Sequence, residues 1–146
     1  MKRITIAALA ATLMLGLAAC GEDAHPDTPK RQHEPNPASK GFIDIPSDGA
    51  TVDTPLRVSG WAVDESGVTG VRIYFDDELM MTAPIVTARP DVEKLYPAYK
   101  TPGAIHGFEA VIDAGSHAGY TVIRAVAIDG KGAQTQIYSI TVKIRE

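Results

Sequence analysis

The chain of 146 residues has little cysteine, few aromatic residues and fewer basic than acidic side chains. Its single cysteine, Cys20, excludes a disulfide within the chain, so packing and hydrogen bonds must hold any folded domain together. The 14 Lys and Arg against 18 Asp and Glu give a net charge of −4 with no basic stripe, which argues against nucleic acid as a partner. With one Trp, five Tyr and three Phe, the core and any binding site must share few rings.

Motifs of common enzymes are missing as well. The chain has no Gly-x-Ser-x-Gly elbow, no His-Glu-x-x-His and no phosphate loop. A hydrolase could be built only from His106 with Asp113, or from His117 with Ser116, and a polar turn residue explains His117 equally well. We therefore expect no catalytic residues, no metal and no cofactor.

The first residues predict export. Lys2 and Arg3 precede an uncharged apolar run over residues 4–19, which is shorter than the roughly 20 residues that span a bilayer as a helix. A short run of this kind, with small residues at its end, is typical of a signal peptide that is removed. We expect residues 1–19 to lie outside the fold of the mature protein.

The end of this run carries a more specific motif, Leu17-Ala18-Ala19-Cys20, which resembles the lipobox of bacterial lipoproteins. The resemblance implies that Cys20 receives a diacylglycerol, that the peptide is cut before it, and that the new amine is acylated. Gly21 stands where lipoproteins retained in the inner membrane carry Asp, so the outer membrane is favoured if the host has one. The alternative is an ordinary secretory signal with a spare cysteine.

Residues 20–40 predict a tether. Beyond Cys20 they hold four of the ten prolines, many charged residues and no large apolar side chain, so they cannot form a core. A proline-rich chain extends by about 3.1 Å per residue, which gives a reach of roughly 60 Å. His25 and His33 offer too few ligands for a metal site.

From Gly41 onward, short alternating runs broken by Gly, Asp and Pro predict an antiparallel β domain over residues 41–146. The absence of a helix long enough for a crossover favours an immunoglobulin-like β-sandwich, with a small β-barrel as the alternative. The run at 120–128 is apolar on both faces and should be central. We expect seven strands, near 42–46, 55–63, 69–76, 79–86, 105–112, 120–128 and 134–145.

Four stretches together resemble the bacterial Ig-like modules of exported and surface proteins: VSGWAVDESGVTGVRIYFDD (58–77), ARPDVEKLYP (88–97), GFEAVID (107–113) and IRAVAIDGKG (123–132). The resemblance covers most of residues 41–146. It implies a non-catalytic spacer, adhesion unit or accessory binding domain. The chain lacks the cysteine pair of antibody domains, so its sheets must be held by packing alone.

Residues 88–99 stand apart from the strands. Pro90 suits the first position of a helix, and Pro97 ends it after one or two turns. Val92, Leu95 and Tyr96 make an apolar stripe that predicts a lid over an edge or open end of the sandwich. The functional alternative keeps Tyr96 and Tyr99 exposed, as rings for a sugar or a partner's apolar patch.

Trp61 follows Gly60 near the end of an expected strand, where core packing is the favoured role. A glycan platform needs two or three coplanar exposed aromatics, and Trp61, Tyr74, Tyr96 and Tyr99 are the set from which one could be built. The acidic residues at turns could supply calcium ligands, but turn capping explains them better. They are Asp64, Glu65, Asp76, Asp77, Asp113 and Asp129.

These features predict a lipid-anchored, non-catalytic Ig-like protein of the bacterial envelope that serves as a protein-interaction, adhesion or scaffold module. The alternative is a small carbohydrate-binding lipoprotein that recognises cell-wall or surface glycan through Tyr96, Tyr99 and Trp61. The expected partners are the membrane, through the lipid on Cys20, and an envelope protein or glycan.

Overall fold

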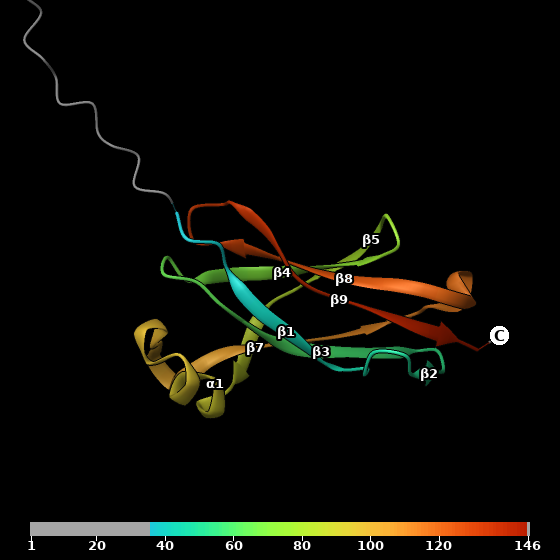
Figure 1. The fold of residues 1–146 in the computed structure, drawn as a ribbon, viewed down its shortest axis with the longest axis horizontal. Coiled ribbons are helices and arrows are strands. Elements are labelled where there is room, and N and C mark those ends of the chain that lie inside the picture. Colours follow the sequence, from blue (N-terminus) through green and yellow to red (C-terminus); the bar gives the residue numbers. More distant parts are fainter. Residues whose placement is uncertain (1–35, 146) are drawn as a thin grey trace, which may run out of the picture. The chain divides into compact units, whose positions relative to one another are not determined.

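The computed structural model describes residues 36–145, which form two β-sheets packed face to face (Figure 1). Sheet A has the spatial order β1-β3-β7-β6, with antiparallel neighbours: β1 (Lys40–Ile45), β3 (Leu56–Val63), β7 (Ile105–Ile112) and β6 (Ile85–Ala88). Sheet B has the order β2-β9-β8-β4-β5, antiparallel except between β2 and β9: β2 (Thr51–Val52), β9 (Gln134–Ile144), β8 (Gly119–Asp129), β4 (Val68–Phe75) and β5 (Glu78–Ala83). The described residues therefore form the expected all-β sandwich, not a closed barrel.

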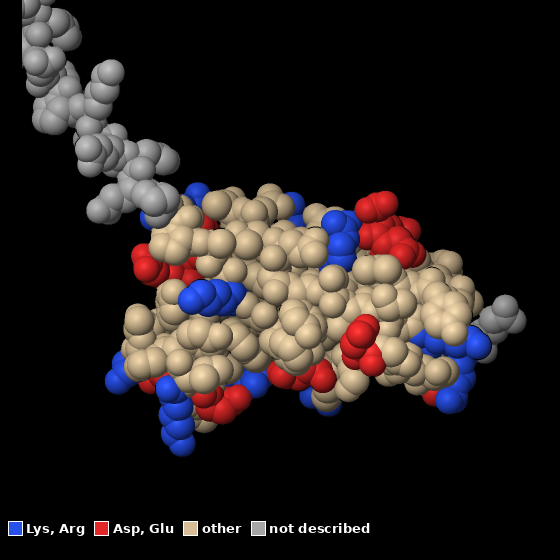
Figure 2. All heavy atoms as spheres, viewed as in Figure 1, with Lys and Arg blue, Asp and Glu red and all other residues tan. Residues whose placement is uncertain are grey.

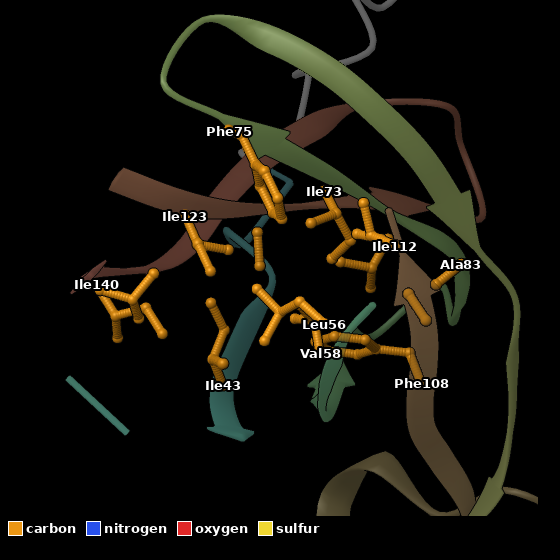
Figure 3. Packing of buried hydrophobic residues seen from close by; sticks show 14 of the residues in the cluster. Ile43, Leu56, Val58, Ile73, Phe75, Ala83, Phe108, Ile112, Ile123 and Ile140 are labelled. Atoms are coloured by element: carbon orange, nitrogen blue, oxygen red, sulfur yellow. The ribbon is translucent and has the colours of Figure 1, made fainter. Parts of the chain in front are cut away.

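Apolar side chains at alternate strand positions fill the space between the sheets (Figure 3). On β4, Val71, Ile73 and Phe75 are fully buried, as their shared face predicted. Strand β8 lies third of the five strands of sheet B, which confirms its expected central place. Fully burying one large apolar side chain contributes about 1.5–3 kcal/mol, so this core is the main stabilising element of a domain without a disulfide.

Strands β1 and β3 approach closely at Gly60. A Cβ atom at this position would lie 2.0 Å from the carbonyl oxygen of Phe42 and 2.8 Å from the Cζ atom of Phe108. The ring of Phe108, 1% exposed, occupies the space that a side chain at position 60 would need. Glycine is therefore required here for space.

The stretch 79–86, expected as one strand, is divided at Pro84. Residues before the proline belong to β5 in sheet B, and residues after it belong to β6 in sheet A. Proline lacks a backbone N–H for the strand ladder, so the chain changes sheets at this point. Strand β2 was not expected, because two residues are too few to show an alternating pattern.

A helical segment, residues 90–104, connects β6 to β7. It consists of α1 (Pro90–Leu95) and two 3₁₀ turns, η1 (Pro97–Tyr99) and η2 (Pro102–Ala104), each of which begins with proline. A third 3₁₀ turn, η3 (Gly115–His117), connects β7 to β8. Among residues 36–145, no helix is both long and apolar enough to cross a membrane.

The apolar stripe expected on the helical segment is only partly buried. Val92 is 2% exposed, whereas Leu95 is 67% exposed at the last residue of α1, which corrects its expected burial. A helix of six residues presents a single turn to the sandwich, and Val92 takes that position.

Residues 36–40, expected in the tether, already contact the sandwich. Asn36 donates to Asp129 over 2.6 Å, and the buried Ser39 donates to Asp64 over 2.9 Å. These two hydrogen bonds bring the chain to Lys40, the first residue of β1. The expectations for the signal peptide, Cys20 and the rest of the tether lie outside the described residues.

Candidate binding site

Trp61 lies on the outer face of sheet A, which corrects the expectation that it packs in the core. Leu56, Val58 and Ala62 on the same strand are buried and belong to the core between the sheets. The period of two along β3 therefore turns Trp61 the other way. Its side chain is half-buried because Tyr96 lies against it.

Tyr96 and Tyr99 reach Trp61 from the helical segment. The ring centroids of Trp61 and Tyr96 are 5.4 Å apart with planes at 43°, and those of Tyr96 and Tyr99 are 6.1 Å apart at 63°. We call these three half-buried residues the aromatic cluster. Tyr74, the fourth candidate, lies on β4 in the other sheet, where the Arg124 guanidinium is 5.1 Å from its ring centroid.

Lys40 lies beside the aromatic cluster. Its Nζ atom lies 5.6 Å from the ring centroid of Tyr96 and 5.9 Å from that of Tyr99. Both distances fall within the roughly 6 Å over which a cation is attracted to a ring face. Sequence reasoning missed Lys40 because it assigned the residue to the tether, and no local pattern marks its later contact with the tyrosines.

Arg89 holds the start of the helical segment on sheet A. Its Nε and Nη2 atoms donate to the carboxylate of Asp91 over 2.9 and 2.7 Å, and Nη1 donates to Asp44 in β1 over 2.6 Å. The hydrogen bond from Arg89 is the main cause that lowers the pKa of Asp91 to about 2. Because the planar guanidinium donates in two directions, one side chain joins α1 to β1.

Gly107 leaves room for this arginine. A Cβ atom at Gly107 would lie 3.1 Å from the Cγ atom of Arg89 and 2.7 Å from the Cβ atom of Thr87. Gly107 also pairs with Trp61 across β3 and β7, so it belongs to the same outer face as the aromatic cluster. The bare backbone at this position lets Arg89 lie close to the sheet beside the cluster.

A polar pair, the buried His106 and the half-buried Glu93, lies beneath the helical segment. His106 is 3% exposed, and its Nε2 atom is 3.7 Å from the Oε2 atom of Glu93, too far for a hydrogen bond. Neither atom has a hydrogen-bond partner within the described part of the chain. A pocket of about 120 Å³ adjoins His106 and is also lined by Tyr99 and Thr101.

Of the two catalytic pairs considered from the sequence, only one is in contact. His106 does not meet Asp113, whose Oδ1 atom accepts hydrogen bonds from Thr54 and Gly115. His117 does meet Ser116, with Oγ and Nδ1 3.1 Å apart, and its Nε2 atom is 3.3 Å from Glu78.

This group of Ser116, His117 and Glu78 lies outside the two pockets described for residues 36–145. Ser116 and Glu78 are exposed, and neither residue lines the 120 Å³ pocket or a second, 290 Å³ pocket beside Lys94 and Lys100. A serine nucleophile needs a substrate pocket and donors for the developing oxyanion beside it. The contact alone therefore supplies no catalytic site.

The acidic residues at strand ends bond to the turns that they begin. Asp64 accepts from the backbone N–H of Ser66 over 2.8 Å, and Asp129 accepts from those of Lys131 and Ala133, each over 2.8 Å. Between residues 36 and 145, no three His, Cys, Asp or Glu side chains gather closely enough to hold a metal ion. Turn capping thus accounts for these two aspartates.

The geometry of the aromatic cluster limits what it can bind. With planes at 43° and 63°, the three rings do not form the flat platform on which a sugar ring stacks. Their faces carry negative potential and suit a rounded or cationic group. On the face of the domain drawn in Figure 2, charged residues of both signs are scattered around a largely uncharged middle.

No curated protein matches the chain. The fibronectin(III)-like modules of Clostridium thermocellum CbhA are 18% identical with a TM-score of 0.47, over 72% of this chain and 45% of that one. CopC from Methylosinus trichosporium OB3b is 15% identical with a TM-score of 0.39, over 73% of this chain and 96% of that one. The family model of the bacterial Ig domain matches residues 43–142, and the chain therefore belongs to the bacterial Ig domain family.

Proposed function

We propose that this chain is a non-catalytic binding module of the bacterial envelope, attached to a membrane by lipid on Cys20, and that it binds a protein partner through the aromatic cluster. Immunoglobulin-like domains are generally non-catalytic and serve in interactions, which supports a non-catalytic binding role. Binding through the aromatic cluster is supported by the position of the cluster on the outer face of sheet A.

The placing of the three rings is the observation that carries the proposal. The chain has one Trp, five Tyr and three Phe, and three of these aromatic residues, Trp61, Tyr96 and Tyr99, lie together outside the core. Aromatic residues at the centre of a contact surface commonly dominate its binding energy. The tilt of the rings favours a protein side chain over the flat face of a sugar.

The lipid anchor supplies the setting for this contact. The motif Leu17-Ala18-Ala19-Cys20 after an apolar run supports acylation of Cys20, and Gly21 supports the outer membrane as the destination. Two or three acyl chains hold a small domain to a membrane durably, because each buried CH₂ contributes about 0.8 kcal/mol. Confinement beside the membrane raises the effective concentration of the domain for an envelope partner.

Substitution at Cys20 tests the anchor. In cells supplied with an alkyne-labelled fatty acid, the full chain should acquire label and enter the detergent phase on phase separation. The Cys20→Ser variant should do neither. Label that persists in Cys20→Ser, or an unlabelled wild type, would refute the anchor without affecting the proposal for the cluster.

Cross-linking in intact cells tests the binding surface. The wild type should yield one reproducible cross-linked protein, and a Tyr96→Ala, Tyr99→Ala double variant should lose it. Tyr120→Ala is the matched control, because Tyr120 is 80% exposed on sheet B, far from the helical segment in sequence. Equal cross-linking by all three proteins would contradict the assignment of the cluster. If the wild type and Tyr120→Ala bind purified cell-wall glycan and the double variant alone does not, the ligand is a glycan instead.

A further inference from the structure

The aromatic cluster already holds one cation, the ammonium group of Lys40. Its Nζ atom is 5.6 Å from the Tyr96 centroid and 5.9 Å from the Tyr99 centroid, so it faces both rings at once. Across residues 36–145, the Lys40 side chain forms no ion pair and donates no hydrogen bond to another side chain. The two rings are thus its contact with the folded domain.

Lysine is a poor occupant for such a site. A primary ammonium is compact and strongly hydrated, and it gives up hydrogen bonds to water when it approaches a ring face. Lys40 is exposed, so its ammonium keeps much of that water. A quaternary ammonium has no N–H to hydrate, and its methyl groups can contact several ring faces together.

Tyr96 and Tyr99 meet at an angle beside the Lys40 ammonium group. Tyr96 lies between the other two, tilted by 43° against Trp61 and by 63° against Tyr99, with centroid separations of 5.4 and 6.1 Å. The tilt between Tyr96 and Tyr99 lets both rings lie within reach of one cation, as the position of Lys40 shows, while Trp61 packs directly against Tyr96. Quaternary ammonium groups are recognised in proteins by cages of this composition.

We propose that Tyr96 and Tyr99, with Trp61 packed against Tyr96, form a binding site for a trimethylammonium group, and that Lys40 occupies this site in the free protein and is displaced by the ligand. The proposal rests on the binding surface of the proposed function, the aromatic cluster, and assigns to it a second class of ligand besides a protein partner. Two sources share this chemistry, a soluble small molecule such as choline and the head group of a choline lipid.

The Lys40 side chain can leave the two rings without a change in the sheet. Lys40 is the first residue of β1 and is exposed, so its side chain can swing into solvent while the strand stays paired with β3. Because the resident cation competes with the ligand, a variant without it should bind more tightly. Removal of Lys40 is therefore expected to strengthen choline binding, whereas removal of a wall should weaken it.

Trp61 serves as the reporter, since it is the only tryptophan and packs against Tyr96. The full-length chain in detergent is titrated with choline chloride, with sodium chloride at equal ionic strength as the control, and Trp61 emission is followed. The wild type should show a saturable change. Lys40→Ala should bind about fivefold more tightly, as expected from loss of a competing cation–π contact. Lys40→Arg, which retains a cation, should resemble the wild type.

Wall variants separate binding from folding. Tyr96→Leu keeps an apolar side chain over Trp61 but removes the ring face, and it should weaken choline binding by about tenfold or more. Tyr120→Ala should bind as the wild type does. An unsaturable response in both wild type and Lys40→Ala, or equal affinities of Lys40→Ala, wild type and Tyr96→Leu, would overturn the proposal.

Two further arms assign the source and separate this proposal from the proposed function. Flotation of the Cys20→Ser variant, which lacks the acyl chains, with phosphatidylcholine vesicles but not with phosphatidylglycerol vesicles would identify the lipid head group. Choline binding by this variant without flotation would identify the soluble ligand. Failure of choline binding beside a tyrosine-dependent protein cross-link would overturn only the cation site. Failure of both would overturn the binding surface as well.

Discussion

Substitution of Gly60 by alanine should strongly destabilise the sandwich. The new Cβ atom would lie 2.0 Å from the Phe42 carbonyl oxygen and 2.8 Å from the Phe108 ring. The first neighbour is backbone, so relief requires β1 to move away from β3, and the second neighbour is fully buried. Overpacking of a core usually lowers the free energy of unfolding by 1–3 kcal/mol, and a backbone contact this short places Gly60→Ala at about 3 kcal/mol.

The control for this prediction is Gly115→Ala. A Cβ atom at Gly115 would meet only Asp113 Oδ1, at 3.4 Å, which is an ordinary contact. Alanine also reduces the conformational freedom of the unfolded chain, which stabilises a compatible site by about 0.4–1 kcal/mol. The two glycine substitutions should therefore change stability in opposite directions.

Thermal unfolding followed by circular dichroism measures the difference, with urea titrations to give free energies. For a domain of this size, about 3 kcal/mol corresponds to a decrease in Tm of roughly 12–24 °C, since each kcal/mol shifts Tm by about 4–8 °C. Gly115→Ala should raise the Tm by a few degrees. If Gly60→Ala unfolds within a degree or two of the wild type, the close approach of β1 to β3 at this residue is refuted.

Three further predictions concern the helical segment and the Asp129 turn. Val92→Ala should lower the free energy of unfolding by about 1.5 kcal/mol in urea titrations, because it removes buried methyl groups; no loss would mean that α1 is not docked. Glu93→Leu should be neutral or stabilising in the same assay, because it removes a buried oxygen that lacks a partner near His106; a large loss would show that the pair is bonded. Burial raises the pKa of Asp129, but hydrogen bonds, the first from Asn36, outweigh it and lower the pKa overall. The Asp129 carboxylate should therefore contribute its full stabilisation above the unfolded pKa of about 3.9, and this contribution should be lost as the pH falls through the folded pKa. In Asp129→Asn, the free energy of unfolding should depend less on pH below about 4. The same pH dependence in the variant and the wild type would contradict the role of Asp129.

The strands and the sandwich could be predicted from the sequence because their signals are local. Alternation along β4 placed Val71, Ile73 and Phe75 on one face, and all three are fully buried. Asp64 and Asp129 were assigned to turns from their neighbours, and their carboxylates do accept backbone N–H groups two residues on. Proline at position 84 was a signal that the single strand at 79–86 should have been divided.

The aromatic cluster was predicted only as a set of residue types. Trp61, Tyr96 and Tyr99 could be named as scarce rings, but a period of two does not tell which face of a strand points inward. Trp61 was therefore expected in the core, and the neighbours on β3 that fill the core decide otherwise. The expected burial of Leu95 failed for a related reason, since one turn of helix buries a single side chain.

By itself the sequence determined the alternation that makes two sheets, the turns between strands, and the export and lipobox motifs from which the lipid anchor is proposed. Only the tertiary structure decided that Tyr96 lies against Trp61, that Lys40 faces two tyrosine rings, and that Arg89 reaches Asp44. The reason is physical. Strands and turns depend on neighbours within a few residues, whereas these contacts join residues far apart in the chain and exist only after the sheets have paired.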